Sequence, residues 1–597
     1  MLSRCYDVLK TVLNQFNRPW VSLVVAGAML AGIVAFLAIS GAGLPTQPTL
    51  NAAQAKEKIP ASDFVGGTAW LNTDKPIKLA DLKGRIVLLD FWTLCCINCI
   101  HTLPDLAKLE ARYPGVLVVI GVHSPKFDNE KKTASIFKAI LRYEIKHPVV
   151  NDADHRIWKA YGVNSWPTLV LIDPDGNYYG TASGEGNLEV LDFHIRKIMK
   201  DFKGKLKEDP IPFKLAKEKF DNSIYFPGKV LADADSNRLF IADSTNHRIV
   251  ITNLEGKKLA IAGSGKEGLK DGTFAQAQFS DPQGMCLDGD TLYVADRKNH
   301  AIRALNLKKE TVTLVAGTGE QNRFGRQPKE TDALKTGLNS PWDLLLHDKM
   351  IYVAMAGHHQ IWQFDPAAKT VVAYAGNGSE QLIDGTLRGS AFAQPSGLAT
   401  DGKRLFVADS EISAIRSVPL PGTKENVSTI VGDGLFEFGD INGKGKDVRL
   451  QHALGVARHD GMLYVADTYN SKIKLIDPES DKIAKIEKQM SIIEIKLDDL
   501  PADAPAAKKL AAEYRMLQKE RFSLGICSIF LGDGPGWLKE KMLDEPGGIS
   551  IAAGKMYIAD TNNHRIQVVD MKTKVMTTLR LQDVPPVPRG EVKAGAK

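Results

Sequence analysis

Hydrophobic and polar positions follow three different patterns along the chain. Residues 20–44 form one long apolar run without a charged side chain. Between about residues 61 and 205, short apolar runs such as Ile86–Trp92 alternate with helical patterns, which is typical of strands buried on both faces of a sheet. After residue 222, alternating strand-like segments and tight polar turns recur. The patterns predict an apolar helix, an α/β domain and an all-β domain, in that order.

The first apolar run has the length and the flanks of a membrane-spanning helix. About 20 apolar residues cross a bilayer, and the stretch from Pro19 to Ala55 carries no charge. Three basic residues precede the run and none follows before Lys56, which predicts a cytoplasmic N-terminus and extracytoplasmic domains. The alternative is a cleaved signal peptide, whose apolar core is usually only about 7–15 residues long.

A cysteine motif follows the predicted strand Ile86–Trp92, where a helical pattern begins. Cys96 and Cys99 enclose two uncharged residues, Ile97 and Asn98. The first turn of a helix has unpaired N–H groups and partial positive charge, which favour a thiolate. We expect Cys96 to be the exposed nucleophile and Cys99 to be a buried resolving thiol within reach of a disulfide.

A proline enters a second buried strand downstream. Pro167 lies between Trp166 and Thr168, just before the apolar run 169–172. Because proline cannot donate a hydrogen bond to a sheet, its presence at a central strand is unusual. A cis Trp166–Pro167 bond explains it.

The C-terminal part contains six copies of one motif, the first at 239–249 and the last beginning at Met556. Each copy is a strand, a tight polar turn and another strand, which cannot bury its apolar face alone and must stack on its neighbours. A period in the fifties suits a four-stranded propeller blade. We therefore expect a six-bladed β-propeller, with a helical insertion at about 485–525, where the interval between copies is longer and helix-favouring.

An aspartate occupies the same turn in five of the six copies. We expect these residues to cap backbone N–H groups, and the Asn-His-Arg residues beside them to close the turn, rather than to form a site. The third and fourth copies depart from the pattern at Met355 and at Ser410-Glu411-Ile412. The five aspartates are Asp243, Asp296, Asp409, Asp467 and Asp560.

Composition changes the picture in two respects. The net charge is only +6 and no basic stripe with aromatic residues is present, so nucleic acid is not an expected partner. Three of the six cysteines fall within residues 95–99, a local cluster that indicates redox or metal chemistry rather than a disulfide scaffold. The expected organisation is a cytoplasmic N-terminus (1–19), a transmembrane helix (20–44), a linker (45–60), the α/β domain (61–205), a linker (206–222), the propeller (223–582) and a disordered tail (583–597).

The residues of the α/β domain resemble the thioredoxin superfamily, especially its membrane-anchored TlpA/ResA-like members. The resemblance places the nucleophile at Cys96, the resolving thiol at Cys99, a buried acid that assists its deprotonation at Asp90, and a helix-bending proline at Pro104. It also implies that Trp166, Pro167 and Thr168 form the loop that presents backbone to an extended substrate. The usual aromatic residue before the nucleophile is Cys95 here.

Other interpretations of these residues remain open. An isolated CxxC is half of a zinc site, although no second cysteine or histidine pair lies nearby in the sequence. Haem attachment requires CxxCH and is excluded, because Ile100 separates Cys99 from His101. A thioredoxin fold retained only for binding is a further alternative. Asp90 is a strand-end cap in the simplest interpretation, and His101 and His123 are packing residues.

The repeats resemble NHL repeats, and the domain order with the Cys-Cys-Ile-Asn-Cys sequence resembles the NHL-repeat-containing protein 2 family over about residues 60–580. The resemblance implies a multidomain protein with a thioredoxin-like domain and a six-bladed NHL propeller, to which a membrane anchor is added. We expect a thiol–disulfide oxidoreductase of the cell envelope that acts on protein thiols or disulfides without a cofactor or metal, and whose propeller recruits or orients partners. The alternative is a non-catalytic interaction platform.

Overall fold

A computed structural model describes most of the chain after residue 49. The predicted transmembrane helix at 20–44 lies outside the described residues, as do most of the second predicted linker and residues 588–597. None of the helices in the described part is both long and apolar enough to span a bilayer. The described residues are 50–52, 58–209, 222–323, 331–423, 425–478, 480–498, 500–501, 504–522, 525–532 and 542–587.

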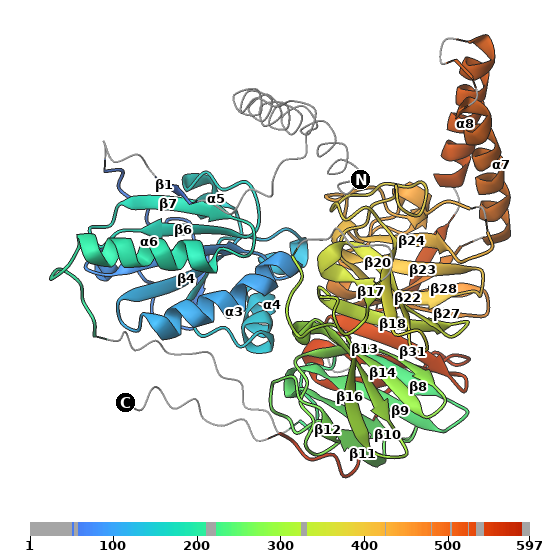
Figure 1. Cartoon of the computed structure of the whole chain (residues 1–597), viewed down its shortest axis with the longest axis horizontal. Coiled ribbons are helices and arrows are strands. Elements are labelled where there is room, and N and C mark those ends of the chain that lie inside the picture. Colours follow the sequence, from blue (N-terminus) through green and yellow to red (C-terminus); the bar gives the residue numbers. More distant parts are fainter. Residues whose placement is uncertain are drawn as a thin grey trace, which may run out of the picture.

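The α/β domain contains one seven-stranded sheet with helices on both faces, in the order β1-β7-β6-β3-β4-β5-β2 (Figure 1). All seven residues of β3 are buried, as expected for the apolar run at this position. β3 pairs parallel with β4 and antiparallel with β6. The elements are β1 Asn51–Ala52, β2 Ala69–Leu71, β3 Ile86–Trp92, α3 Ile97–Arg112, β4 Leu117–His123, α4 Thr133–Arg142, β5 Val149–Asn151, α5 Arg156–Ala160, β6 Thr168–Ile172, β7 Tyr178–Ser183 and α6 Leu188–Asp201.

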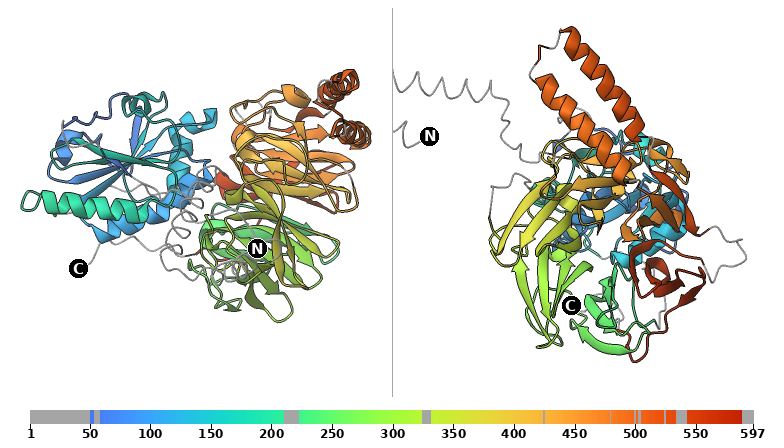
Figure 2. Two further views of the ribbon diagram at one scale, coloured as in Figure 1. Left: turned by 45° about the horizontal axis from the view of Figure 1, so that its top comes forward. Right: turned by 90° about the vertical axis from the view of Figure 1, so that its right-hand side faces the viewer.

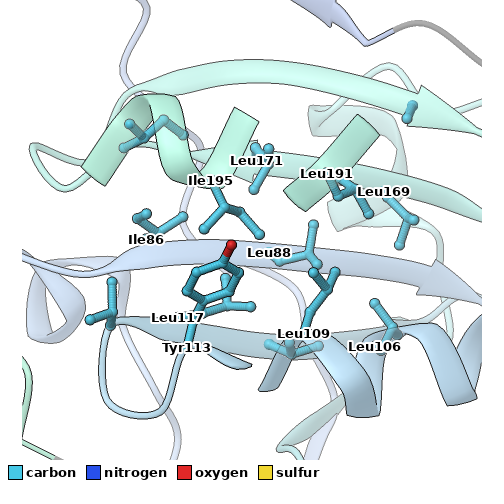
Figure 3. Close-up of a cluster of buried hydrophobic side chains, with 14 of the residues drawn as sticks. Ile86, Leu88, Leu106, Leu109, Tyr113, Leu117, Leu169, Leu171, Leu191 and Ile195 are labelled. Atoms are coloured by element: carbon cyan, nitrogen blue, oxygen red, sulfur yellow. The ribbon is translucent and has the colours of Figure 1, made fainter. Parts of the chain in front are cut away.

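Two apolar cores cover the two faces of this sheet. On one face, α3 and α6 pack against β3, β4 and β6 through a cluster that includes Leu88, Leu109 and Ile195 (Figure 3). Successive strand residues point to opposite faces, so Val87, Leu89 and Phe91 of β3 lie in the second core. Asp90 therefore lies on the α3 side of the sheet, where the cysteine motif begins.

Two segments that were predicted to lie outside the folded domains contribute residues to them in the structure. In the predicted linker 45–60, β1 pairs with β7 at the sheet edge and Leu50 is buried in the core. In the predicted tail 583–597, Val584 is buried and the Pro585 carbonyl accepts a hydrogen bond from Arg248. Apolar contacts with the adjacent domain order both segments, which their polar composition did not predict.

Six sheets form the propeller, each built from consecutive strands, with a short outer strand added to three of them (Figures 1 and 2). The inner strand of the sixth blade, β31, lies against β8 of the first, which closes the ring. The blades are β8 Val230–Asp233, β9 Arg238–Asp243, β10 Arg248–Thr252, β11 Lys258–Ala262; β12 Gly272–Thr273, β13 Pro282–Asp288, β14 Thr291–Asp296, β15 Ala301–Asn306, β16 Thr311–Ala316; β17 Thr331–Asp332, β18 Pro341–His347, β19 Met350–Met355, β20 Gln360–Asp365, β21 Thr370–Ala375; β22 Pro395–Thr400, β23 Arg404–Asp409, β24 Ala414–Pro419, β25 Ser428–Val431; β26 Gly443–Lys444, β27 Gly455–His459, β28 Met462–Asp467, β29 Lys472–Asp477, β30 Ile526–Leu531; and β31 Pro546–Ala552, β32 Lys555–Asp560, β33 Arg565–Asp570, β34 Met576–Thr578.

The predicted helical insertion is a helix pair between β29 and β30 of the fifth blade. α7 (Ser480–Asp498) and α8 (Pro505–Phe522) pack against each other and project from the ring (Figures 1 and 2). Tyr514 of α8 donates to Glu494 of α7 over 2.6 Å.

The repeated turn residues are structural, as predicted. Asp243 accepts the Tyr225 N–H at 2.7 Å, and the equivalent aspartate of each regular blade accepts the corresponding backbone donor. His247 adopts a left-handed conformation at the end of the turn, and its Nδ1 accepts the Asp281 N–H of the next blade at 3.2 Å. The aspartate thus ties two strands of its own blade together, and the histidine joins that blade to the next.

Candidate thiol site

The cysteine motif begins α3, as predicted. Cys96 is the N-cap residue, and its Sγ accepts a hydrogen bond from the Cys99 N–H at 3.4 Å. Cys96 is partly exposed, whereas Cys95 and Cys99 are buried. The cysteines at 95, 96 and 99 are all free thiols in this structure. Of the three, Cys96 alone combines exposure with a helix N-terminus, the environment that favours a nucleophilic thiolate.

The inner side of the motif holds two buried acidic groups. Burial raises the pKa of the Cys99 thiol well above its usual range, and the nearby Asp90 carboxylate raises it further. Burial also raises the pKa of Asp90 to about 7. A carboxylate with that pKa is ready to accept the Cys99 proton near neutral pH.

The loop predicted to present substrate lies beside the motif. The Trp166–Pro167 bond is cis, as predicted. Trp166 packs against the apolar cluster that contains Cys95, Cys96 and Cys99, and its Nε1 donates to the Ser124 carbonyl at 2.9 Å. Thr168 pairs with Phe91 in the sheet, one residue beyond Asp90. Cys96 and Cys99 thus lie at the start of α3, Trp166 packs against their cluster, and Asp90 and Thr168 lie on the adjacent strands β3 and β6.

The propeller closes over the outer side of the motif, which the sequence did not predict. Gln394, at the start of the fourth blade, accepts the Ile97 N–H at 2.9 Å and donates to the Cys95 carbonyl at 3.0 Å. Ile97 is buried against Trp342 and Ala356 of the third blade and Leu454 of the fifth. The residues on both sides of Cys96 are thus held by the propeller.

Charged contacts fix the same interface. Lys126 forms a buried ion pair with Glu411 of the fourth blade, and both side chains are less than 10% exposed. Arg142 of α4 pairs with Glu545 of the sixth blade at 2.7 Å. Phe127 contacts Phe438 and Tyr469 with ring centroids 4.8 and 5.6 Å apart.

His101 bonds Ser340 Oγ at 2.7 Å, and His123 stacks edge-on against Trp92; both are packing residues, as predicted.

The irregular third and fourth copies of the repeat were the feature of the sequence that could have indicated this interface. Where the regular blades carry a polar turn after their aspartate, the third carries Met355-Ala356 and the fourth Ser410-Glu411-Ile412. In the structure, Ala356 contacts Ile97 and Glu411 pairs with Lys126. Both irregular turns therefore contact the α/β domain, as do residues such as Gln394 that no motif marks.

Two groups of side chains have the composition of a cation site. Cys95, Glu411 and His452 bring ligand atoms within 4.8 Å of one another, as do Glu144, His247 and Glu267. In each group a lysine already neutralises a carboxylate: Lys126 pairs with Glu411, and Lys298 with Glu267 at 2.7 Å. The protein itself supplies the positive charge at both positions.

Comparisons with known proteins agree with this geometry. The family described as thioredoxin-like matches residues 84–178, and the NHL repeat matches residues 279–305 and 543–569. The chain is thus a thioredoxin-like domain joined to a six-bladed NHL propeller. It is 38% identical to NHL repeat-containing protein 2 of chicken (Gallus gallus) over 551 residues, which cover 85% of this chain and 70% of that protein. The chain belongs to the NHL repeat-containing protein 2 family.

The α/β domain has further relatives of its own. It is 33% identical over 124 residues to the thiol-disulfide oxidoreductase ResA of Bacillus cereus, a match that covers 21% of this chain and 69% of that protein. A crystal structure of a putative thiol:disulfide interchange protein DsbE from Chlorobium tepidum is 25% identical, with a TM-score of 0.22, and covers 24% of this chain and 99% of that one.

Proposed function

We propose that this protein is a thiol–disulfide oxidoreductase that acts on protein disulfides through Cys96 and Cys99, and whose propeller orients the site and limits access to it. The observation that carries the proposal is the arrangement at the start of α3: a partly exposed thiol at the N-cap, a buried thiol one turn further, and a buried acid with a raised pKa beneath them. The resemblance to ResA supports it.

The chemistry follows from these positions. The Cys96 thiolate attacks a partner disulfide, so that a Cys96–partner bond forms and one partner thiolate leaves. Cys99 then gives its proton to the Asp90 carboxylate and attacks Cys96 Sγ, which releases the second partner thiolate. Two electrons pass to the partner and the protein retains a Cys96–Cys99 disulfide. The same steps in reverse oxidise a partner dithiol.

A variant series with the full chain tests this function. Wild type, Cys96→Ser and Cys99→Ser are compared in dithiothreitol-driven reduction of glutathione disulfide and of insulin. We expect Cys96→Ser to be inactive and Cys99→Ser to stop at the mixed disulfide. Cys286→Ser, a buried thiol of the propeller, is the matched control and should keep the wild-type rate. Equal rates for wild type and Cys96→Ser would contradict the proposal.

A non-catalytic interaction platform is the second candidate. It is favoured by the contacts that bury Cys95 and Ile97 on either side of Cys96, because these contacts cover surface that a large substrate would need. In that case neither disulfide would be reduced faster than by dithiothreitol alone. Reduction of glutathione disulfide but not of insulin would instead indicate an active thiol site whose access the propeller restricts.

We further propose that residues 20–44 anchor the protein in a membrane, with its domains outside the cytoplasm. The charge-free apolar run and the basic residues that precede it support this proposal. Alkaline extraction of cell membranes tests it: full-length protein should stay in the membrane pellet, and a chain lacking residues 1–44 should not. Recovery of the full chain in the soluble fraction would contradict membrane anchoring.

A further inference from the structure

Several buried polar atoms lie on the inner side of the cysteine motif, near the β3–β4 pair Asp90 and Gly121. Asp90 Oδ1 and Oδ2, Trp92 Nε1 and His147 Nε2 are buried, and none has a hydrogen-bond partner among the described residues. Asp90 lies opposite Gly121 in the β3–β4 ladder. A Cβ atom at Gly121 would lie 3.0 Å from Trp92 Nε1 and 3.5 Å from His147 Nε2. The indole and imidazole nitrogens therefore both lie close to Gly121, the residue opposite Asp90, together with Val149 Cγ2 at 3.1 Å.

These polar groups have the chemistry that binds a buried water. A buried water normally has about three polar partners, and orphaned polar groups inside a protein are costly. The carboxylate accepts hydrogen bonds, the indole N–H donates one, and the imidazole nitrogen does either according to its tautomer. A water would satisfy both Asp90 and His147, whose buried atoms make no direct hydrogen bond to each other.

His147 also reaches the solvent side of the domain. Its side chain is 4% exposed, and its Nδ1 lies 3.4 Å from Oε2 of Glu110, whose side chain is 29% exposed. Both residues line a cleft of about 690 Å³ between α3 and the first two propeller blades. His147 therefore lies close both to Gly121, opposite Asp90, and, through Glu110, to the open cleft.

We infer that His147 is the positioning residue that carries protons between the Asp90 carboxyl group and the interdomain cleft, with Glu110 as its outer partner. The inference rests on the proposed function. Histidine suits this task because each ring nitrogen either binds or releases a proton near neutral pH. The titratable or charged groups around it are Asp90 on β3, Cys99 and Glu110 on α3, and Arg142, Glu144 and Lys146 near the start of β5.

The proton balance shows when the path is needed. When Cys99 resolves a mixed disulfide, its thiol proton passes to Asp90. The electron pair of the Cys99 thiolate forms the new Cys96–Cys99 bond, and the pair of the broken Cys96–partner bond leaves with the partner thiolate. Asp90 must then lose this proton before the next cycle, although its carboxyl group is fully buried. His147 takes the proton through the bridging water and delivers it to Glu110 and the cleft. Reduction of the disulfide uses the same path inward.

Release of thionitrobenzoate from 5,5′-dithiobis(2-nitrobenzoate) tests the inference. The full chain with Cys5→Ser should release one equivalent when Cys96 is modified and a second when Cys99 resolves the mixed disulfide. The rate of the second phase should rise with pH through about 7, where Asp90 becomes ionised. In His147→Gln this rate should fall about tenfold, and its pH midpoint should move upward, because the positive charge of His147 lowers the pKa of Asp90.

Two further variants serve as a second test and as a control. Glu110→Gln removes only the half-exposed outer partner, so it should fold and slow the second phase about threefold. His194→Gln, on α6 and away from the motif, should match wild type. An unchanged midpoint in His147→Gln, whatever its rate, or a Glu110→Gln variant equal to wild type would overturn the inference. Absence of the second phase in wild type itself would instead contradict the proposed function.

Discussion

The two sides of the first turn of α3 are both buried but are built differently. On the inner side, Cys99 faces Asp90, and the nearby polar atoms lack protein partners within the described chain. On the outer side, the Cys95 carbonyl and the Ile97 N–H are both hydrogen-bonded to Gln394, and Ile97 packs against apolar residues. Protons can move only where groups are left free to change partners. The inner side therefore suits proton exchange, and the outer side suits a fixed position.

This difference also indicates which step at the thiols the propeller can affect. Asp90 is fully buried within the sheet of the α/β domain. The propeller contacts the turn before and after Cys96 and so governs the approach of a substrate to that sulfur. Changes on the outer side should thus alter access, whereas changes on the inner side should alter the resolution step.

The largest effect is expected from the buried ion pair on the outer side. Lys126→Met leaves Glu411 buried without its partner, which costs about 3–5 kcal/mol. Because the Ile97 amide is bonded to the propeller, its hydrogen exchange reports separation of the domains and should become at least about a hundredfold faster. Hydrogen–deuterium exchange with peptide mapping measures this rate.

Two variants control for other causes. Lys131→Met removes an exposed pair with Asp128, whose side chains are 53% and 64% exposed, and should change exchange little. Lys126→Met combined with Glu411→Met removes both charges and should restore most of the protection. Unchanged protection in the single variant would show that the ion pair does not hold the domains together.

The next effect concerns the inner side. Asp90→Asn removes the proton acceptor of Cys99 and should slow the second thionitrobenzoate release about a hundredfold, with no pH midpoint near 7. The first release should keep its rate, because Cys96 is attacked before Asp90 acts. A second phase at the wild-type rate would contradict the role of Asp90.

The stability of the same variant should depend on pH in a defined direction. Burial raises the folded pKa of Asp90 from 3.8 to about 7. The native state then binds more protons than the unfolded state between about pH 4 and 7, so this carboxyl group destabilises the fold increasingly as the pH rises. At pH 8, Asp90→Asn should be more stable than wild type by roughly 4 kcal/mol, and at pH 4 the two should be similar. Urea unfolding at both pH values measures the difference.

The smallest effect is expected for Gln394→Ala. Loss of the amide leaves the Ile97 N–H and the Cys95 carbonyl without their partner, at a cost of roughly 1–3 kcal/mol if the domains stay together. Opening of the interface relieves that cost, so the first thionitrobenzoate release should become severalfold faster. Gln363→Ala, whose amide bonds Tyr352 within the third blade, should leave the release unchanged. A slower release from Gln394→Ala would contradict restriction of access by the propeller.

The inner side and the blades were predictable because local rules determine them. A strand followed by CxxC and a helix fixes where Cys96 and Cys99 lie, and the repeated turn indicates a structural role for Asp243, although its partner, the Tyr225 N–H, lies outside the turn. The helix pair at 480–522 follows from composition. These features depend on residues close in the chain or on a repeat.

The outer side was not predictable in the same way. Gln394 lies nearly 300 residues from the Ile97 N–H that it accepts, and neither residue has a pattern that indicates the other. His147 stands outside any motif, and its role depends on its closeness to Gly121, opposite Asp90, which only the packing shows. Glu411 did leave a trace, since it interrupts a turn that other blades keep. Such departures within a repeat are worth treating as candidate contacts.

The central claim is that Cys96 and Cys99 form one redox pair while Cys95 stays reduced, and a redox titration tests it most directly. The full chain is equilibrated in glutathione buffers of graded potential, alkylated, digested and mapped by mass spectrometry. We predict that Cys96 and Cys99 lose their alkylation together in a two-electron transition, linked to each other, while Cys95 remains alkylated after denaturation at every potential. A Cys99 that stays alkylated throughout, or a disulfide that includes Cys95, would contradict the account.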